Sequence, residues 1–312
     1  MRWRFALSFT AAVSLLPAAG QAAPPPDLTV DGYPVEAQLT AAFALPDQSL
    51  GLRYLPSYRA LRDDGSAPIE LHADHGTVVA QGDNAWRYLP ANRFFSDLKI
   101  TAEGRTLTLR VFQLTPLPAN TAQLSGIPIG TYPEPAGRGA QANAYQRPRG
   151  LLLVPRSQRD TAVSTHLTLG QFVTGDQRER AVAATLLTTP LVEALEHLMT
   201  TLKERRWPGQ TLTILSGWRS PRHNANVGGA PYSRHIYGDA VDLLVDADGD
   251  GRMDDLDDNG RSDRDDVEWL IARFMRQALP VTMGGAGSYD SAGPAAAFLH
   301  LDTRGVSRAW QR

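Results

Sequence analysis

The sequence contains no cysteine among its 312 residues, which excludes disulfide bonds, thiolate metal ligands and cysteine nucleophiles. It also has no apolar run of about 20 residues, the length that a membrane-spanning helix requires. The net charge is small, because 31 Lys and Arg nearly balance 33 Asp and Glu, and this balance argues against a dominant nucleic-acid-binding role. At about 150 residues per domain, the length predicts two globular domains.

The small net charge hides an uneven distribution. Residues 246–266 contain ten Asp and three Arg, so this segment carries −7 and leaves +5 for the rest of a chain whose total is −2. Carboxylates at this density repel one another unless solvent or bound cations separate them. The segment is therefore a candidate cation site.

The first 22 residues are typical of a secretory signal peptide. Arg2 and Arg4 form a basic start, residues 5–16 an apolar stretch, and residues 20–22 a small-x-small cleavage site. A buried N-terminal helix is the weaker alternative, because Pro17 would interrupt it. We therefore expect a periplasmic or secreted protein.

Residues 23–160 are typical of a β-rich domain, either a sandwich or a barrel. Residues 105–114 alternate with period two, and Glu103-Gly104 joins them to residues 97–101 as an expected hairpin. Further strands are expected at 69–72, 77–80 and 150–154. No motif in this half indicates a function.

Residues 161–312 combine helices with strands and predict an α+β domain. Leucines at helical spacing follow the Thr189-Pro190 start of a helix that extends to residue 206. The other elements expected are a helix at 266–279 and strands at 211–215, 240–245 and 298–302.

Two histidines and an aspartate in this half have the residue types of a zinc site. His235 lies seven residues before Asp242, and His300 follows in the last predicted strand, with Asp302 on the same strand face. Three protein ligands leave a fourth position for water, which is the arrangement of a catalytic site rather than a closed structural one.

The residues around these ligands carry a resemblance to a known family. The segments SGWRSP at 216–221, SRHIYGDAVD at 233–242, GGAG at 284–287 and HLD at 300–302 resemble the zinc D-alanyl-D-alanine carboxypeptidase family, which includes VanY-type and VanX-type peptidoglycan peptidases and has a hedgehog-type zinc fold. The resemblance covers roughly residues 164–312. It implies an exported zinc metallopeptidase, in which zinc-activated water attacks a bond in peptidoglycan stem peptides.

The resemblance also implies roles for individual residues. His235, Asp242 and His300 would bind zinc, Ser233 would bind substrate, and Arg219 would polarise the scissile carbonyl or hold a substrate carboxylate. The enzyme would be a D-Ala-D-Ala carboxypeptidase or a related D,D- or L,D-endopeptidase.

One position departs from the family pattern. The best-known members have a Glu general base three residues before the final His, and this chain has Ala297 there. Asp302 is the nearest carboxylate on the same strand face. It could act as the base, which we favour slightly, or it could orient His300 or a bound water. The missing Glu also permits a non-catalytic alternative, a metal-stabilised cell-wall-binding module. A third alternative is a calcium-dependent adhesion or scaffold protein that uses the β-rich half.

The acidic segment matches the twelve-position calcium loop of EF-hand proteins twice, nine residues apart, in a spacing that resembles thrombospondin-type repeats. We expect two calcium ions, and calcium is then expected to order the wall of the zinc site. The predicted ligands of the two overlapping loops are Asp246, Asp248, Asp250, the carbonyl of Arg252, Asp254 and Asp257, and then Asp255, Asp257, Asn259, the carbonyl of Arg261, Asp263 and Asp266.

Overall fold

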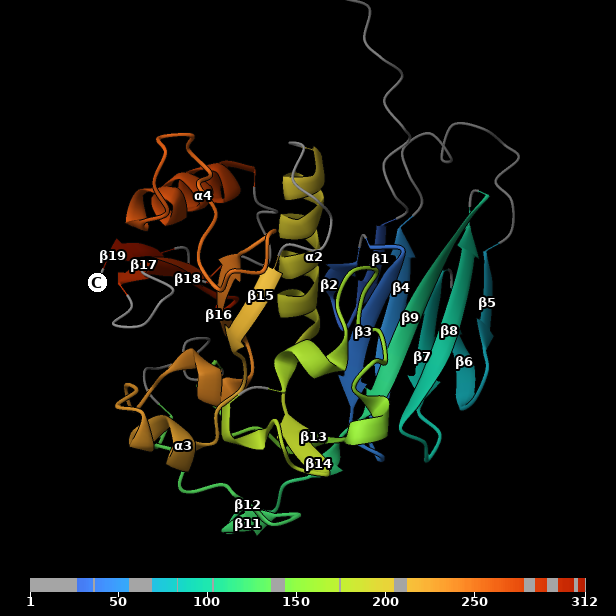
Figure 1. The fold of residues 1–312 in the computed structure, drawn as a ribbon. Helices are drawn as coiled ribbons and strands as arrows, with labels where there is room; N and C mark the ends of the chain where they lie inside the picture. The colour runs from blue at the N-terminus through green and yellow to red at the C-terminus, as the bar shows by residue number, and fades with distance from the viewer. Residues whose placement is uncertain are drawn as a thin grey trace, which may run out of the picture.

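The computed structural model describes residues 27–35, 37–55, 69–82, 84–102, 104–135, 144–173, 175–204, 212–277, 284–290, 297–305 and 308–311. The predicted signal peptide lies outside these residues. The described chain is mostly β with few helices (Figure 1). Among the described residues, no helix is both long enough and apolar enough to cross a membrane.

The N-terminal half of the described chain contains two β-sheets that face each other. Alternating apolar side chains from both sheets meet in one core, which includes Leu28 and Leu52 from the first sheet and Leu98 and Leu109 from the second. The first sheet has the order β2-β1-β4-β7-β6, with β1 (Asp27–Val30), β2 (Tyr33–Val35), β4 (Leu50–Leu55), β6 (Thr77–Gly82) and β7 (Ala85–Leu89). The second has the order β3-β9-β8-β5, with β3 (Leu39–Ala44), β5 (Glu70–Ala73), β8 (Phe95–Ala102) and β9 (Arg105–Gln113).

The hairpin expected near residue 104 is present. β8 and β9 pair antiparallel from Phe95 opposite Phe112 to Ala102 opposite Arg105. Gly104, in the turn, has a φ of 74°, a left-handed conformation that glycine adopts without steric cost. Burial alternates from Leu107 to Val111 of β9, as the period-two pattern of residues 105–114 predicted.

Short strands and 3₁₀ helices connect this half to the C-terminal sheet. β13 pairs with β10 on one side and with β14 on the other, and β14 was not expected from the sequence. The elements are β10 (Thr115–Pro116), β11 (Gln123–Leu124), β12 (Ile127–Pro128), β13 (Gly150–Pro155), η1 (Arg156–Gln158), η2 (Leu169–Phe172), η3 (Gly175–Gln177) and β14 (Val182–Thr185).

The C-terminal half is built on a five-stranded sheet of order β15-β16-β18-β17-β19. Its neighbours are antiparallel except for the parallel pair of β17 and β19. The strands are β15 (Leu212–Ser216), β16 (Ala240–Val245), β17 (Gly285–Asp290), β18 (Ala297–Asp302) and β19 (Arg308–Gln311), and the helices are α2 (Thr189–Glu204), α3 (Pro221–Asn226), η4 (Arg234–Tyr237) and α4 (Arg264–Gln277). The expected helices and strands of this half are therefore present in the described residues, and the expected ends at 206, 211 and 279 lie outside them.

Helix α2 lies between the N-terminal sheets and the C-terminal sheet (Figure 1). Its leucines are buried in a core that also contains Phe112 of β9, Leu243 of β16 and Leu299 of β18. The two halves therefore share one continuous apolar core, which holds β16 and β18 in a fixed position. These two strands carry two of the three predicted zinc ligands.

Candidate metal centre

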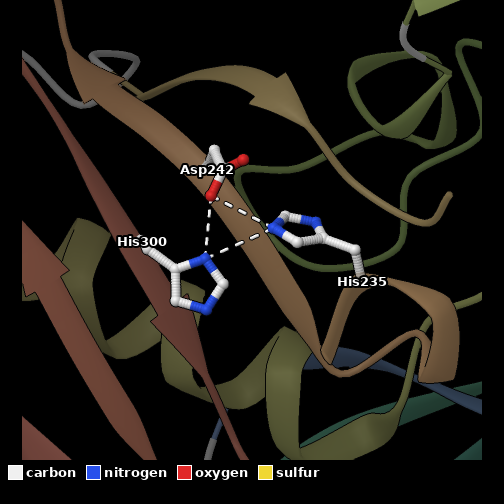
Figure 2. A group of neighbouring side chains, drawn as sticks. All are labelled: His235, Asp242 and His300. Carbon is white, nitrogen blue, oxygen red and sulfur yellow. Dashed lines mark hydrogen bonds and ion pairs between the residues drawn. The ribbon is translucent and has the colours of Figure 1, made fainter. Parts of the chain in front are cut away.

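The structure brings His235, Asp242 and His300 together (Figure 2). Asp242 Oδ1 lies 2.8 Å from His300 Nδ1 and 3.1 Å from His235 Nε2, and the two histidine nitrogens are 3.3 Å apart. Asp242 and His300 are directly opposite each other on β16 and β18, so sheet register fixes this pair. All three residues are buried.

His235 reaches the cluster from η4, just before β16. Its Nδ1 lies 2.8 Å from the carbonyl oxygen of Gly217, and this contact turns Nε2 toward Asp242 and His300. Gly238 then makes the turn into β16 with a φ of 78°, and a Cβ atom there would lie 2.4 Å from Leu186 Cγ. The glycine is therefore required for the tight turn between the first two ligands.

Asp302 lies behind His300, on the opposite side of its ring from Asp242. Its Oδ2 is 3.5 Å from His300 Nε2, whereas Nδ1 of the same ring faces the metal cluster. Asp302 is completely buried, and it accepts hydrogen bonds from the Gly285 amide at 3.0 Å and from Arg304 Nε at 2.8 Å. The sequence slightly favours the role of general base for Asp302, whereas this geometry favours orientation of His300.

The charges of these groups depend on one another. Burial alone would raise the pKa of Asp242, but the imidazoles of His235 and His300 outweigh it and hold the pKa well below its usual range. Burial would also raise the pKa of Asp302, but His300 and Arg304 lower it. Burial would lower the pKa of His300, and hydrogen bonds to Asp242 and Asp302 instead raise it to about 9. Both carboxylates are therefore anionic at neutral pH.

The donor set fits a zinc ion. Two imidazole nitrogens and one carboxylate oxygen converge within 4.8 Å of one another, and these are preferred zinc ligands. The imidazole nitrogen that points away from the cluster contacts an oxygen in each histidine. His235 Nδ1 contacts the carbonyl oxygen of Gly217, and His300 Nε2 contacts Asp302 Oδ2. Such outer contacts fix the ring orientation of zinc-binding histidines.

Arg219 contacts the cluster directly. Its Nη2 forms an ion pair with Asp242 Oδ2, and its Nε donates a hydrogen bond to Ser216 Oγ at 2.7 Å. Ser233 lies at the N-cap of η4 and lines the same cleft. Both predicted substrate-contact residues are thus beside the metal ligands.

The cluster lies in a cleft of about 650 Å³. Tyr289 and Phe298 stack on each other with ring centroids 5.3 Å apart and give the cleft an aromatic wall next to His300. Sequence reasoning missed these two residues and Arg304, which also lines the cleft. Phe298 could have been found, because it shares the face of β18 that carries His300 and Asp302.

Ala297 lies on the other face of β18. It is 1% exposed and belongs to the apolar core with Leu299 and Leu301. A carboxylate at this position of the strand would enter the core rather than the cleft. Among the described residues, Asp242 is the only acidic residue that lines the cleft.

A buried ion pair in the wall of the cleft was also missed. Arg234 pairs with Asp239, and its Nη1 donates to the carbonyl of Ala144 at 2.7 Å. The guanidinium also lies over the rings of Tyr145 and Tyr237, at 4.9 and 4.6 Å from their centroids. The pair therefore connects the loop before β13 to the wall of the metal site.

The acidic segment forms two carboxylate clusters outside the cleft. One oxygen from each of Asp246, Asp248 and Asp254 lies within 4.8 Å of the others, and the same is true of Asp255, Asp257 and Asp266. The structure therefore places Asp257 in the second cluster only, although the sequence assigned it to both loops. Of the other expected ligands, Asp250 and Asp263 contribute no carboxylate oxygen to either cluster, whereas Asn259 and the carbonyls of Arg252 and Arg261 stay predictions, because the clusters contain carboxylates only.

A buried cluster of two imidazoles and one carboxylate in a cleft is the arrangement of a mononuclear zinc hydrolase. Residues 169–258 match the family model described as Peptidase M15. This region contains Arg219, His235 and Asp242, and the match supports a zinc metallopeptidase domain in the C-terminal half. No curated protein and no solved structure shows a significant match to the sequence.

Proposed function

We propose that this protein is an exported zinc peptidase that cleaves peptidoglycan stem peptides, as a D-Ala-D-Ala carboxypeptidase or a related endopeptidase. The observation that carries the proposal is the buried His235–Asp242–His300 cluster on the wall of an open cleft, in a region that matches Peptidase M15. Zinc bound there would lower the pKa of a bound water to about 7 and polarise a peptide carbonyl.

The protein's own residues hold and orient the site. Asp302 and the Gly217 carbonyl fix the rings of His300 and His235, so that one nitrogen of each faces the ion. Arg219 keeps Asp242 oriented through its ion pair and presents a guanidinium at the cleft, where it can stabilise negative charge on the carbonyl oxygen. Asp302 acts in this scheme as a positioning residue.

The charges of the cleft support an anionic substrate. Three arginines line it, and each is paired with a carboxylate, Arg219 with Asp242, Arg234 with Asp239 and Arg304 with Asp302, so a net positive charge depends on the metal ion. Bound zinc would supply two positive charges. A peptide that carries free carboxylates, such as a stem peptide ending in D-Ala, is attracted to such a cleft.

Export and calcium complete the proposal. The basic and apolar pattern of residues 1–22 supports cleavage and release into the periplasm or the medium. Calcium would be a structural cofactor held by the acidic segment, because none of the residues that line the cleft comes from 246–266.

One observation favours a second candidate, a non-catalytic cell-wall-binding module. No acidic side chain besides the metal ligand Asp242 lines the cleft in the described part of the chain. A site without a free carboxylate can still hold zinc and bind a peptide.

Incubation of the purified protein with muropeptides distinguishes the two functions. The peptidase is expected to release D-Ala or cleave cross-links when zinc is present, and to lose this activity after chelation and in His300→Ala. Mass spectrometry of the products is the readout. Binding of muropeptides without any product, at every zinc concentration, would contradict the peptidase and support the binding module.

A further inference from the structure

The first carboxylate cluster of the acidic segment contains a buried oxygen that lacks a hydrogen-bond partner. Asp246 follows directly after β16 and is only 7% exposed. Its Oδ2 accepts hydrogen bonds from the Gly251 amide at 3.2 Å and from Thr213 Oγ1 at 3.4 Å, whereas its Oδ1 is buried and accepts none. A buried carboxylate oxygen without a donor is unfavourable, because it has lost its water and gained nothing in return.

The side chains that converge with Asp246 are carboxylates, which when ionised cannot donate a hydrogen bond and instead attract a cation. Asp248 and Asp254 each bring an oxygen within 4.8 Å of that of Asp246, so three anionic groups converge on one point. Backbone amides of the same loop bind Asp248 Oδ1, from Asp250 at 3.1 Å, and Asp254 Oδ2, from Ala247 at 2.9 Å. These contacts fix the two side chains in place but leave Asp246 Oδ1 without a partner.

We infer that Asp246, Asp248 and Asp254 form a binding site for one calcium ion, independent of the zinc centre. All three ligands are carboxylates with hard oxygen donors, which suit calcium better than zinc or copper. The site lies in a loop whose Met253 and Leu256 are buried in the apolar core that contains the leucines of α2. The ion therefore joins the end of β16 to a loop that the core already anchors.

The second cluster differs in a way that limits the inference to one ion. Asp266 is completely buried, but its two oxygens accept hydrogen bonds from the amides of Leu256 at 2.6 Å, Asp257 at 3.2 Å and Asp263 at 2.8 Å. Asp255 likewise accepts from the amides of Asn259 and Gly260. Backbone amides thus satisfy the buried carboxylate here without an ion. The structure assigns one site where the sequence predicts two.

Calcium titration of the zinc-loaded full chain tests this inference, with calcium chloride alone as the probe and isothermal calorimetry as the readout. The expected result is one calcium ion per chain, and a loss of affinity of at least about tenfold in Asp246→Asn, because one charged ligand of an oxygen site is removed. Asp258→Asn is the matched control. It makes the same change of charge in the same segment, at a residue outside both clusters whose φ of 61° suits asparagine.

The outcomes separate clearly. The inference is overturned if the wild-type chain binds no calcium or binds two ions with equal affinity. It is also overturned if Asp246→Asn binds calcium as the wild type does, or if Asp246→Asn and Asp258→Asn lose equal affinity. If Asp246→Asn does not fold, Asp248→Asn replaces it, since Asp248 is exposed and its loss leaves no buried group unpaired. Muropeptide cleavage is measured in parallel, so that failure of the calcium site and failure of the peptidase are distinguished.

Discussion

The predicted zinc centre and the proposed calcium loop would hold a cation in opposite ways. The zinc ligands are buried, belong to η4, β16 and β18, and include two histidines that are 65 residues apart in the sequence. The proposed calcium ligands lie within nine residues of one another, and Asp248 is exposed. The zinc site therefore depends on the whole fold, whereas the calcium site depends on one loop.

This difference determines what sequence alone reveals about each site. The ligands of a local loop follow a fixed spacing that can be recognised in the sequence. The spacing does not show which of the carboxylates already accept hydrogen bonds from backbone amides. A site assembled by a sheet has no fixed spacing, and its ligands become clear only from the residues around them. Substitutions in the two regions should therefore have effects of different size and reach.

The largest effect is expected for His300→Ala. Zinc content of the purified protein should fall to background, and activity on muropeptides should fall by more than about 100-fold, the upper limit for loss of an outer contact alone. Calcium binding should stay at the wild-type level, because the loop is local. Loss of calcium binding together with zinc would show that the two sites are not separate.

Ala297→Glu is expected to destabilise the protein without adding a general base. Position 297 lies in the apolar core, so a glutamate there would be buried without a partner and cost about 3 kcal/mol of unfolding free energy. Thermal melting and muropeptide cleavage measure the two effects. A rise in activity would show that the strand can turn this side chain into the cleft. Phe298→Glu, on the cleft face, is the comparison variant.

A smaller loss is expected for Asp302→Asn. If Asp302 orients His300, zinc affinity should fall about 10-fold to 100-fold, and activity should recover when zinc is added in excess. Asp290→Asn, an exposed carboxylate at the end of β17, is the control. A variant that keeps full zinc affinity but loses activity at every zinc concentration would instead identify Asp302 as the general base.

Calcium is expected to have the smallest effect. At ten times the dissociation constant, one bound ion stabilises the folded state by about 1.4 kcal/mol, which is measurable as a shift of the melting temperature. The stabilisation should fall to about 0.4 kcal/mol or less in Asp246→Asn, whose affinity is expected to be at least about tenfold weaker, and remain unchanged in Asp258→Asn. An equal shift in all three proteins would place the ion elsewhere.

Much of the C-terminal half could be predicted from the sequence. β16 matches the expected strand at 240–245, and α2 begins at the expected Thr189-Pro190 pair. β17 was not predicted, because its sequence GAGSYD has little strand propensity and becomes a strand by pairing with β18. Its glycines suit this position, since Gly287 lies directly opposite His300 and leaves room beside the ring.

The details of the site were harder to predict. Strand alternation correctly placed Asp302 on the face of His300, but it could not show that Asp302 lies on the far side of the imidazole ring. The pairing of Arg304 with Asp302 depends on the turn after β18, and the contact of Arg234 with Ala144 joins residues 90 apart. Such contacts follow from tertiary packing, for which no local pattern exists.

The pairing of β13 with β14 has a practical consequence for dissecting the molecule. A boundary at residue 160 falls between these strands, which pair from Leu152 opposite Thr185 to Pro155 opposite Val182. A fragment that begins at residue 161 would expose the unpaired edge of β14 and remove Leu151 from the core around Trp218 and Ile236. Expression of the peptidase region alone therefore calls for a start well before β13, so that the fragment keeps this strand and the Tyr145 loop.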